Sequence, residues 1–468
     1  MKKFSALVAG LILSVSAWSA DFYTILTKAQ GGDVSAQSEL GTMYYLGKET
    51  KQDYQKANEW LTKAAHQGDT NALYYLGLLY SNSQYTANDE QKAFEFLRQS
   101  AELNYPTAQT SFGLRLIGQN NCNDGIAWLE KAANQGDDSA FLFLEFIYQE
   151  FTDKELRIHN TLYPQCPKNN TKYFYWTHKH ALTGNPYAQS QLASLYLTGI
   201  GTAIDYQQAY YWASLASDND SSYGSAIVAN LYRNGLGVAK NPTKAIEYYK
   251  KTISQIQGEL ARQIDGLVKD SSQQLLNSSM SMLASYYYEL GMYTHAHGYL
   301  TQLLYTTEAN AAKSLLATMY SEGLGVTKNE EQAFVYNKDL AELGFPENQF
   351  NVGLAYHLGL GVQIDYHQAV YWYTLAANQG ISDAQLNLGV LYAEGQGVRQ
   401  DDKTAFNWYA KAAAQGNTIA QENIGSFYYD GTGVRQNKTL AKEWYGKACD
   451  GGSQDGCDMY RQLKQAGY

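Results

Sequence analysis

A nine-residue phrase, Ala-x-x-x-Leu-Gly-x-x-Tyr, recurs along the chain and is the feature that most constrains its fold. Six of the ten intervals between successive copies are 36 residues long. The central position of the phrase falls at Gly41, Gly77, Gly113, Glu145, Ala193, Ala229, Ala284, Ala317, Gly353, Gly389 and Gly425. A fixed period of this length is typical of proteins that stack one small unit on the next, because a single unit cannot bury its apolar face alone. The sequence therefore predicts about eleven stacked units.

The spacing inside each unit predicts two helices. Ala, Leu, the central residue and Tyr lie at i, i+4, i+5 and i+8, which is one face of a helix. A second helix-like phrase follows, typified by residues 405–416, and in eight copies an aromatic residue such as Trp408 stands nineteen positions after the central residue. Gly-x-Gly-Val, as in residues 235–238, separates the phrases, and a glycine such as Gly416 suits the left-handed cap that ends a unit. We therefore predict an all-α fold, an α-solenoid of about eleven antiparallel helix pairs.

Residues 257–279 interrupt this regular period. About nineteen residues are inserted here, and Leu260, Ile264 and Leu267 are spaced for one amphipathic helix. We expect an inserted helix or hinge over residues 257–279. It would divide an N-terminal array of about six repeats, residues 20–256, from a C-terminal array of about five repeats plus a capping helix, residues 280–468.

The beginning of the sequence predicts export. A charged start, an apolar run over residues 4–15 and small residues before Ala20 are typical of a secretory signal peptide, which we place at residues 1–19. We therefore expect a periplasmic or secreted protein. No later segment has about 18 uncharged apolar residues in a row, so no membrane span is predicted. The net charge is −10 and no basic block occurs, which argues against a nucleic-acid partner.

The four cysteines predict two disulfides in an exported chain. Three pairings are formally possible. Proximity in the sequence favours Cys449 with Cys457 and leaves Cys122 with Cys166. No histidine or further cysteine stands nearby at the spacing of metal ligands, so the sequence predicts no metal site and no cofactor.

The three phrases together resemble the Sel-one-like repeat family, a relative of tetratricopeptide repeats. The third of them is Trp-Tyr-x-Lys-Ala-Ala-x-Gln-Gly, and the likeness covers nearly the whole chain after residue 20. It implies a right-handed superhelix used for protein interaction and adaptor roles. Residues 447–457 are also similar to exported, cysteine-rich members, whose paired cysteines bridge the second helix of one repeat to the first helix of the next. Some of those members have been described as penicillin-binding or weak β-lactamase proteins, so a cell-wall or β-lactam-binding or β-lactam-hydrolysing protein is the alternative function.

The motifs of common enzymes are missing from the sequence. Ser-x-x-Lys, Gly-x-Ser-x-Gly, His-Glu-x-x-His and the phosphate-binding glycine loops do not occur, so we predict no catalytic residue. His178 and His180 stand two positions apart on a predicted helix, where their side chains diverge, and we interpret them as solvated or loop-capping residues. About half of the aromatic residues fill core positions of the repeat, which disfavours a sugar-stacking surface.

Partner binding is instead predicted on the outer face of the first helices. The positions three before and one after the central residue point away from the partner helix, and first helices usually line the concave face of such solenoids. In five units these positions are apolar: Tyr74, Leu78, Leu114, Leu142, Phe146, Phe350, Leu354, Leu386 and Val390. The alternative is that these side chains pack against neighbouring first helices. We therefore hypothesise an exported scaffold or adaptor that holds a protein partner, either a cell-envelope complex or a host protein with a virulence-associated role.

Overall fold

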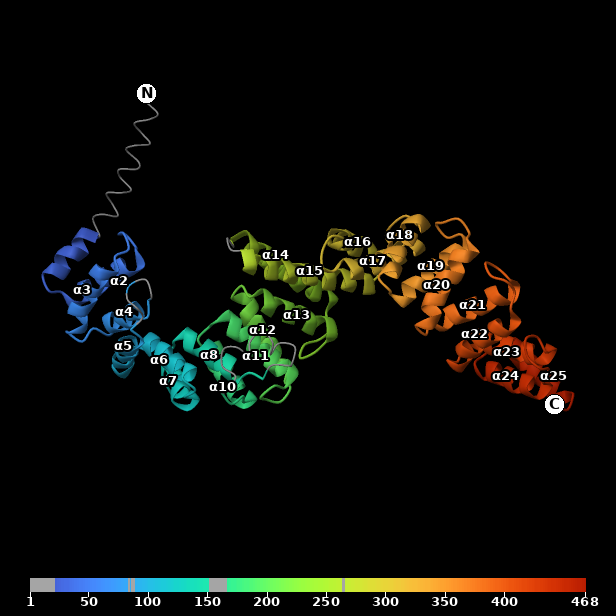
Figure 1. Ribbon diagram of the computed structural model, residues 1–468, viewed down its shortest axis with the longest axis horizontal. Coiled ribbons are helices and arrows are strands. Elements are labelled where there is room, and N and C mark those ends of the chain that lie inside the picture. The colour runs from blue at the N-terminus through green and yellow to red at the C-terminus, as the bar shows by residue number, and fades with distance from the viewer. Residues whose placement is uncertain (1–21, 83–84, 86–88, 151–165, 263–265) are drawn as a thin grey trace, which may run out of the picture. The chain divides into compact units, whose positions relative to one another are not determined.

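The computed structural model describes residues 22–82, 85, 89–150, 166–262 and 266–468. All regular structure within these ranges is helical, and consecutive helices pack as pairs (Figure 1). The predicted fold class, an α-solenoid, is thereby confirmed. The predicted signal peptide, residues 1–19, lies outside the described residues.

Eleven helix pairs follow one another in the described part of the chain, and we number the repeats by these pairs. They are α2 (Val34–Leu46) with α3 (Tyr54–Ala65), α4 (Thr70–Tyr80) with α5 (Glu90–Glu102), α6 (Pro106–Gly118) with α7 (Cys122–Asn134), α8 (Asp138–Tyr148) with α10 (Asn170–Leu182), α11 (Pro186–Thr198) with α12 (Tyr206–Asp218), α13 (Ser222–Asn234) with α14 (Pro242–Arg262), α15 (Gly266–Glu289) with α16 (Tyr293–Leu300), α17 (Ala309–Glu322) with α18 (Glu330–Glu342), α19 (Pro346–Leu358) with α20 (Tyr366–Asn378), α21 (Ser382–Glu394) with α22 (Asp402–Ala414), and α23 (Thr418–Asp430) with α24 (Lys438–Asp450). Helix α25 (Gln454–Gln465) follows the last pair, and a short 3-10 helix, η1 (Thr301–Leu303), follows α16.

The chain forms two compact units, residues 1–248 and 249–468. The boundary falls inside α14, before the irregular stretch of residues 257–279. The described residues 257–262 end α14, which spans 21 residues, and the described residues 266–279 begin α15, which spans 24. The inserted helix or hinge over residues 257–279 stays a prediction.

Local caps explain where the helices begin and end. After α3, Gly68 adopts a φ of 84°, a left-handed conformation that favours glycine. Asp69 follows and its carboxylate accepts a hydrogen bond from the backbone N–H of Ala72 at 2.7 Å, which caps the start of α4. The predicted punctuation, a left-handed glycine followed by an Asp or Asn cap, is therefore confirmed at this junction.

The small central residue lets the two helices of a repeat approach closely. A Cβ added at Gly389 of α21 would lie 2.6 Å from Tyr409 Cε1 of α22, which is closer than atoms can pack. Trp408, the neighbour of Tyr409, is half-buried, and the ammonium of Lys411 lies 3.8 Å from its ring centroid. Such cation–π contacts stabilise exposed sites by about 0.5–1 kcal/mol. The repeated aromatic residues therefore serve the packing of the helix pair.

A repeated glutamine joins neighbouring units. Gln385 of α21 donates to the carbonyl of Ala377 at the end of α20, which also accepts a hydrogen bond from the backbone N–H of Gly380. Its own amide oxygen accepts a hydrogen bond from Gln415, at the end of α22, at 2.8 Å. The same bond to an alanine carbonyl eight residues earlier is made by Gln37, Gln109, Gln189, Gln349, Gln385 and Gln421. These side chains staple one repeat to the next without adding apolar surface.

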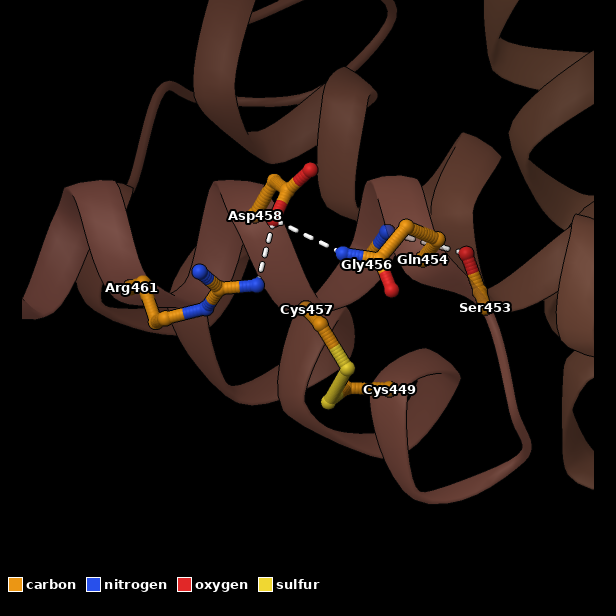
Figure 2. Close-up of a disulfide and its surroundings, with 7 residues drawn as sticks. All are labelled: Cys449, Ser453, Gln454, Gly456, Cys457, Asp458 and Arg461. Atoms are coloured by element: carbon orange, nitrogen blue, oxygen red, sulfur yellow. Dashed lines mark hydrogen bonds and ion pairs between the residues drawn. A yellow bond between two sulfur atoms is a disulfide. The ribbon is translucent and has the colours of Figure 1, made fainter.

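Both predicted disulfides are present. Cys122, the first residue of α7, pairs with Cys166, which precedes α10, with 5.6 Å between their Cα atoms. Cys449 of α24 pairs with Cys457 of α25, so this bond joins the last repeat to the helix that follows it (Figure 2). The loops they close span 44 and 8 residues, and the chain-entropy model gives about 4 and about 2.5 kcal/mol of stabilisation.

Candidate functional site

The C-terminal set of predicted binding residues is largely used in packing. Leu386 is only 7% exposed and belongs to the core around Tyr409, so it is corrected from a surface residue to a core residue. Val390 packs against the same core, and Phe350 and Leu354 pack against the core of the preceding repeat. The physical reason is that the first helices α19 and α21 contact each other, which is the alternative that the sequence left open.

Three of the N-terminal residues are also partly engaged. The ring centroid of Tyr74 lies 5.6 Å from that of Tyr105, and Leu114 packs against the apolar core of repeats 3 and 4. Leu78 is half-buried. These three side chains are therefore only partly accessible to a partner.

Leu142 and Phe146 line a cavity of about 490 Å³ on α8, which we call the repeat-4 pocket. Leu142 is 44% exposed and Phe146 is half-buried. The lining residues are Ser139, Leu142, Phe143, Glu145, Phe146, Gln149, Tyr173 and Tyr187. A volume of this size is within the usual range for sites that take a small ligand or a side chain.

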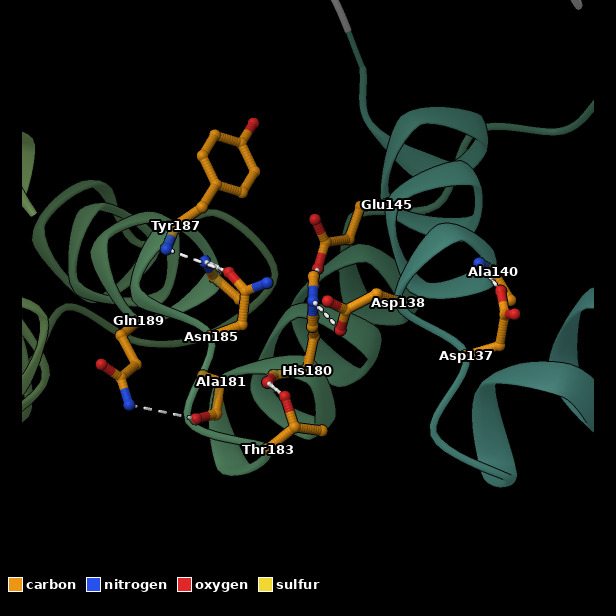
Figure 3. Close-up of polar contacts among 11 residues, drawn as sticks. Asp137, Asp138, Ala140, Glu145, His180, Ala181, Thr183, Asn185, Tyr187 and Gln189 are labelled. Atoms are coloured by element: carbon orange, nitrogen blue, oxygen red, sulfur yellow. Dashed lines mark hydrogen bonds and ion pairs between the residues drawn. The ribbon is translucent and has the colours of Figure 1, made fainter. Parts of the chain in front are cut away.

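A buried contact between a glutamate and a histidine lies beside this pocket. Glu145 of α8 is 5% exposed, and its carboxylate lies 2.9 Å from Nδ1 of His180 on α10, which is completely buried (Figure 3). The imidazole stacks on the ring of Phe141, with 4.9 Å between centroids and 4° between planes. Because a buried carboxylate without a partner is costly, the imidazole is what allows Glu145 to occupy this position.

The far side of the imidazole faces another carboxylate. Nε2 of His180 lies 3.3 Å from Oδ1 of Asp138, which is close enough for an ion pair, although the geometry is not that of a hydrogen bond. Asp138 is the first residue of α8 and its side chain is exposed. The interpretation of His180 as a solvated residue is therefore wrong, since it is fully enclosed between two carboxylates and a phenylalanine. His178, its neighbour on α10, is half-buried and its ring packs edge-on against Trp212.

Two tyrosines complete the pocket. Burial, and next the charge of Glu145, raises the pKa of Tyr173, which is 5% exposed. Tyr187 is 53% exposed, but the partly buried surroundings of its hydroxyl raise its pKa, as does the charge of Glu145, against a hydrogen bond from Gln191 that lowers it. Both phenols are therefore protonated at neutral pH and able to donate hydrogen bonds into the pocket.

The described residues contain no group of three or more His, Cys, Asp and Glu side chains arranged to hold a metal ion. In the same ranges, no helix is both long and apolar enough to cross a membrane. A second cavity, of about 430 Å³, lies in the other unit between α17, α18 and α19, and its lining is mainly Ser, Thr, Asn and Glu. The predicted binding residue Leu354 lines this second cavity together with Phe334 and Leu360. Large apolar side chains form a greater share of the lining in the repeat-4 pocket.

Comparison with known proteins gives the family. The Sel1 repeat model matches nine segments: residues 34–69, 70–105, 111–137, 186–221, 223–255, 310–344, 346–381, 382–417 and 418–453. The chain belongs to the Sel1 repeat family. Sel1 repeat proteins generally mediate protein–protein interactions. A search of curated proteins finds no match.

One solved structure, with a TM-score above 0.5, agrees with this Sel1 assignment. The chain is 26% identical to c5321, a protective antigen present in uropathogenic Escherichia coli strains, with a TM-score of 0.66 over 95% of this chain and 90% of that one. A Sel1 repeat protein from Oxalobacter formigenes is 21% identical, over 88% of this chain and 93% of that one, with a TM-score of 0.38. The cysteine rich protein B of Helicobacter pylori is 25% identical over 28% of this chain and 95% of that one, with a TM-score of 0.24.

The family model leaves residues 138–185 unmatched, and the described part of this range contains the two helices of repeat 4. Glu145 stands where other Sel1 repeats have Gly or Ala. His180 stands four residues after Trp176, where Ala412 follows Trp408 in repeat 10. The sequence analysis missed Glu145, Tyr173, Tyr187 and His180 as site residues. The available signal was the one charged residue in the series of central positions, paired with a histidine in an alanine position.

Proposed function

We propose that this Sel1 repeat protein is an exported interaction scaffold, and that the repeat-4 pocket receives a segment of its protein partner. The single observation that supports the site most strongly is the cavity lined by Leu142, which is 44% exposed, and by Phe146. Enclosed apolar walls with a few convergent polar groups are what a binding site for a protein segment requires.

Export is supported by the N-terminal sequence and by the disulfides. Two disulfides persist most readily in an oxidising compartment, and residues 1–19 have the pattern of a signal peptide. The likeness to c5321, described as a protective antigen, adds the expectation of a host or envelope partner. We therefore propose a periplasmic or secreted location and a partner of one of these two kinds.

Site-specific photo-crosslinking tests the proposal. A photoreactive residue at Leu142 should crosslink a discrete partner in envelope or host-cell extracts, because Leu142 stands at the pocket. The matched control is Leu182 of α10, which is 65% exposed in the same repeat and does not line the pocket. Equal crosslinking from both positions, or from neither, would contradict the proposed site.

The substitutions Leu142→Ser and Phe146→Ser provide the second test. We expect partner capture to fall while the melting temperature changes little, and Leu182→Ser to leave capture intact. A clear loss of stability with unchanged capture per folded molecule would show that these side chains act in packing. Turnover of a chromogenic β-lactam by the same preparation would instead support the alternative function.

A further inference from the structure

The buried carboxylate of Glu145 is incompletely paired. Among the described residues, its hydrogen-bond partner is the imidazole of His180, which contacts one of its two oxygens. The other oxygen points away from the imidazole (Figure 3), and Glu145 is part of the pocket lining. A carboxylate accepts several hydrogen bonds, so the second oxygen of Glu145 keeps acceptor capacity for a group inside the pocket that Glu145 lines. A hydrogen-bond donor inside the pocket would complete it.

The walls define what should carry that donor. Leu142, Phe143 and Phe146 give the pocket an apolar side, which suits an aliphatic stem rather than a small ion. Tyr173 and Tyr187 add aromatic rings, whose faces attract a cation. An apolar stem that ends in a positive donor matches both the walls and the carboxylate.

The charges around the pocket favour the same ligand, with one competitor. The charge of Glu145 contributes to the raised pKa values of Tyr173 and Tyr187, so its negative field reaches both phenols. Lys168 opposes this field, because its ammonium lies 5.8 Å from the ring centroid of Phe146 and 3.5 Å from the Phe146 carbonyl oxygen. Burial lowers the pKa of Lys168. An ammonium is therefore already accommodated beside one wall, outside the pocket lining.

We infer that the repeat-4 pocket takes a lysine or arginine side chain of the partner segment, with Glu145 as the acceptor of its charged end. This inference rests on the proposed function and makes the partner's chemistry specific. It also assigns a role to the unusual Glu145 and His180 pair, which holds a carboxylate in a helix seam that elsewhere admits only small residues.

Calorimetric titration with short capped peptides tests the inference. The probes are Ac-Gly-Ser-Xaa-Ser-Gly-NH2, in which Xaa is arginine, lysine, norleucine or glutamate, added to the purified protein. We expect the arginine or lysine peptide to bind at least tenfold more tightly than the norleucine peptide, and the glutamate peptide not to bind. Equal affinity for norleucine, or no binding by any peptide, would overturn the inference.

Variants locate the effect. Glu145→Gln removes the charge but keeps an acceptor for His180, so it should reduce arginine binding to the norleucine level. Asp138→Asn is the control, because this exposed carboxylate contacts the same imidazole outside the pocket, and it should change nothing. Lys168→Met should strengthen arginine binding. An unchanged affinity in Glu145→Gln would contradict the assignment.

One measurement needs no variant, in case Glu145→Gln does not fold. A tenfold rise in ionic strength should weaken the arginine peptide and leave the norleucine peptide unaffected, since salt screens the charge interaction alone. Insensitivity to salt would overturn the inference. Crosslinking from Leu142 detects any molecule that occupies the pocket. If a partner crosslinks there but none of the peptides binds, the proposed function stands and the inference that the pocket takes a lysine or arginine side chain is rejected.

Discussion

Repeats 4 and 10 use the same helix-pair plan with different residues at four equivalent positions. In repeat 10 the central residue is Gly389, against which Tyr409 packs, and Gln385 staples the repeat to its predecessor. In repeat 4 the corresponding residues of α8 are Glu145 and Phe141, and the residue after the aromatic Trp176 is Thr177. A large side chain at the central position thus coincides with a small one across the seam.

The difference shows how a repeat that serves only packing can differ from a repeat that forms a candidate binding site. In repeat 10 the apolar residue three positions before the centre, Leu386, is buried, whereas Leu142 at the same position in repeat 4 is 44% exposed. In repeat 4, Glu145 also lines a pocket, where Gly389 contributes only to packing. Replacing Gly, Gln and Ala by Glu, Phe and His therefore exchanges close packing for an accessible cavity with a charged group.

The largest effect is expected from moving the repeat-4 residue into repeat 10. Gly389→Glu would force a side chain onto Tyr409 and bury a carboxylate that has no imidazole partner. We expect a loss of about 4 kcal/mol, measured by chemical denaturation, as overpacking and an unpaired buried charge combine. Gly298→Glu is the control, since the added Cβ meets open space on α16 and should be tolerated. Similar losses in both variants would contradict this packing account.

A smaller loss is expected from breaking the pair in repeat 4. His180→Ala leaves Glu145 buried without its partner, which should destabilise the protein by about 3 kcal/mol. Adding Glu145→Gly restores the residue types of repeat 10, and most of that loss should be recovered in a double-mutant cycle. Strictly additive losses would mean that the two residues do not act as a pair.

The hydrogen bonds of Gln385 between neighbouring repeats should contribute less to the free energy of unfolding than the contact between Glu145 and His180. Gln385→Leu removes the donor to the Ala377 carbonyl and the acceptor for Gln415, so we expect a loss of about 1–2 kcal/mol in the free energy of unfolding. The exposed Gln368 of α20 serves as the control, and Gln368→Leu should be close to neutral. An equal loss of stability in Gln385→Leu and Gln368→Leu would show that the hydrogen bonds of Gln385 do not stabilise the junction between repeats.

The smallest effect is a loss of stability at alkaline pH. It is expected in repeat 10 at Tyr409 and not in repeat 4, where Thr177 occupies the equivalent position. Burial, and then the charge of Glu394, raises the pKa of Tyr409 to about 12, so the folded state favours the neutral phenol. Its contribution is complete below the unfolded pKa of about 10 and is lost as the pH rises towards 12. Tyr409→Phe should therefore reduce the loss of stability at pH 11 by about 1 kcal/mol. Identical pH profiles would contradict this.

Most of the fold could be predicted from the sequence, because the spacing of residues within each repeat indicates two helices that pack as a pair. The helix pairs, the left-handed glycine at Gly68 and the disulfide between Cys449 and Cys457 follow from spacing and proximity alone. The helices α14 and α15 were harder, because an amphipathic spacing such as that of Leu260 and Ile264 fits a continued helix as well as a separate one.

The site could be predicted only in part. Outer-face logic selected Leu142 and Phe146, but it also selected Leu386, because the depth of contact between neighbouring first helices cannot be read from helical periodicity. The Glu145 and His180 pair joins residues 35 positions apart. Their juxtaposition follows from the fold, whereas their unsuitability for a seam of small residues was already visible in the sequence.

A crystal structure of the protein soaked with the arginine peptide tests the central claim most directly. The account predicts a guanidinium within hydrogen-bond distance of the Glu145 carboxylate, with its stem along Leu142 and Phe146 and the His180 contact retained. A peptide bound elsewhere, with the repeat-4 pocket empty or closed by its own side chains, would contradict the claim that this exceptional repeat is the binding site.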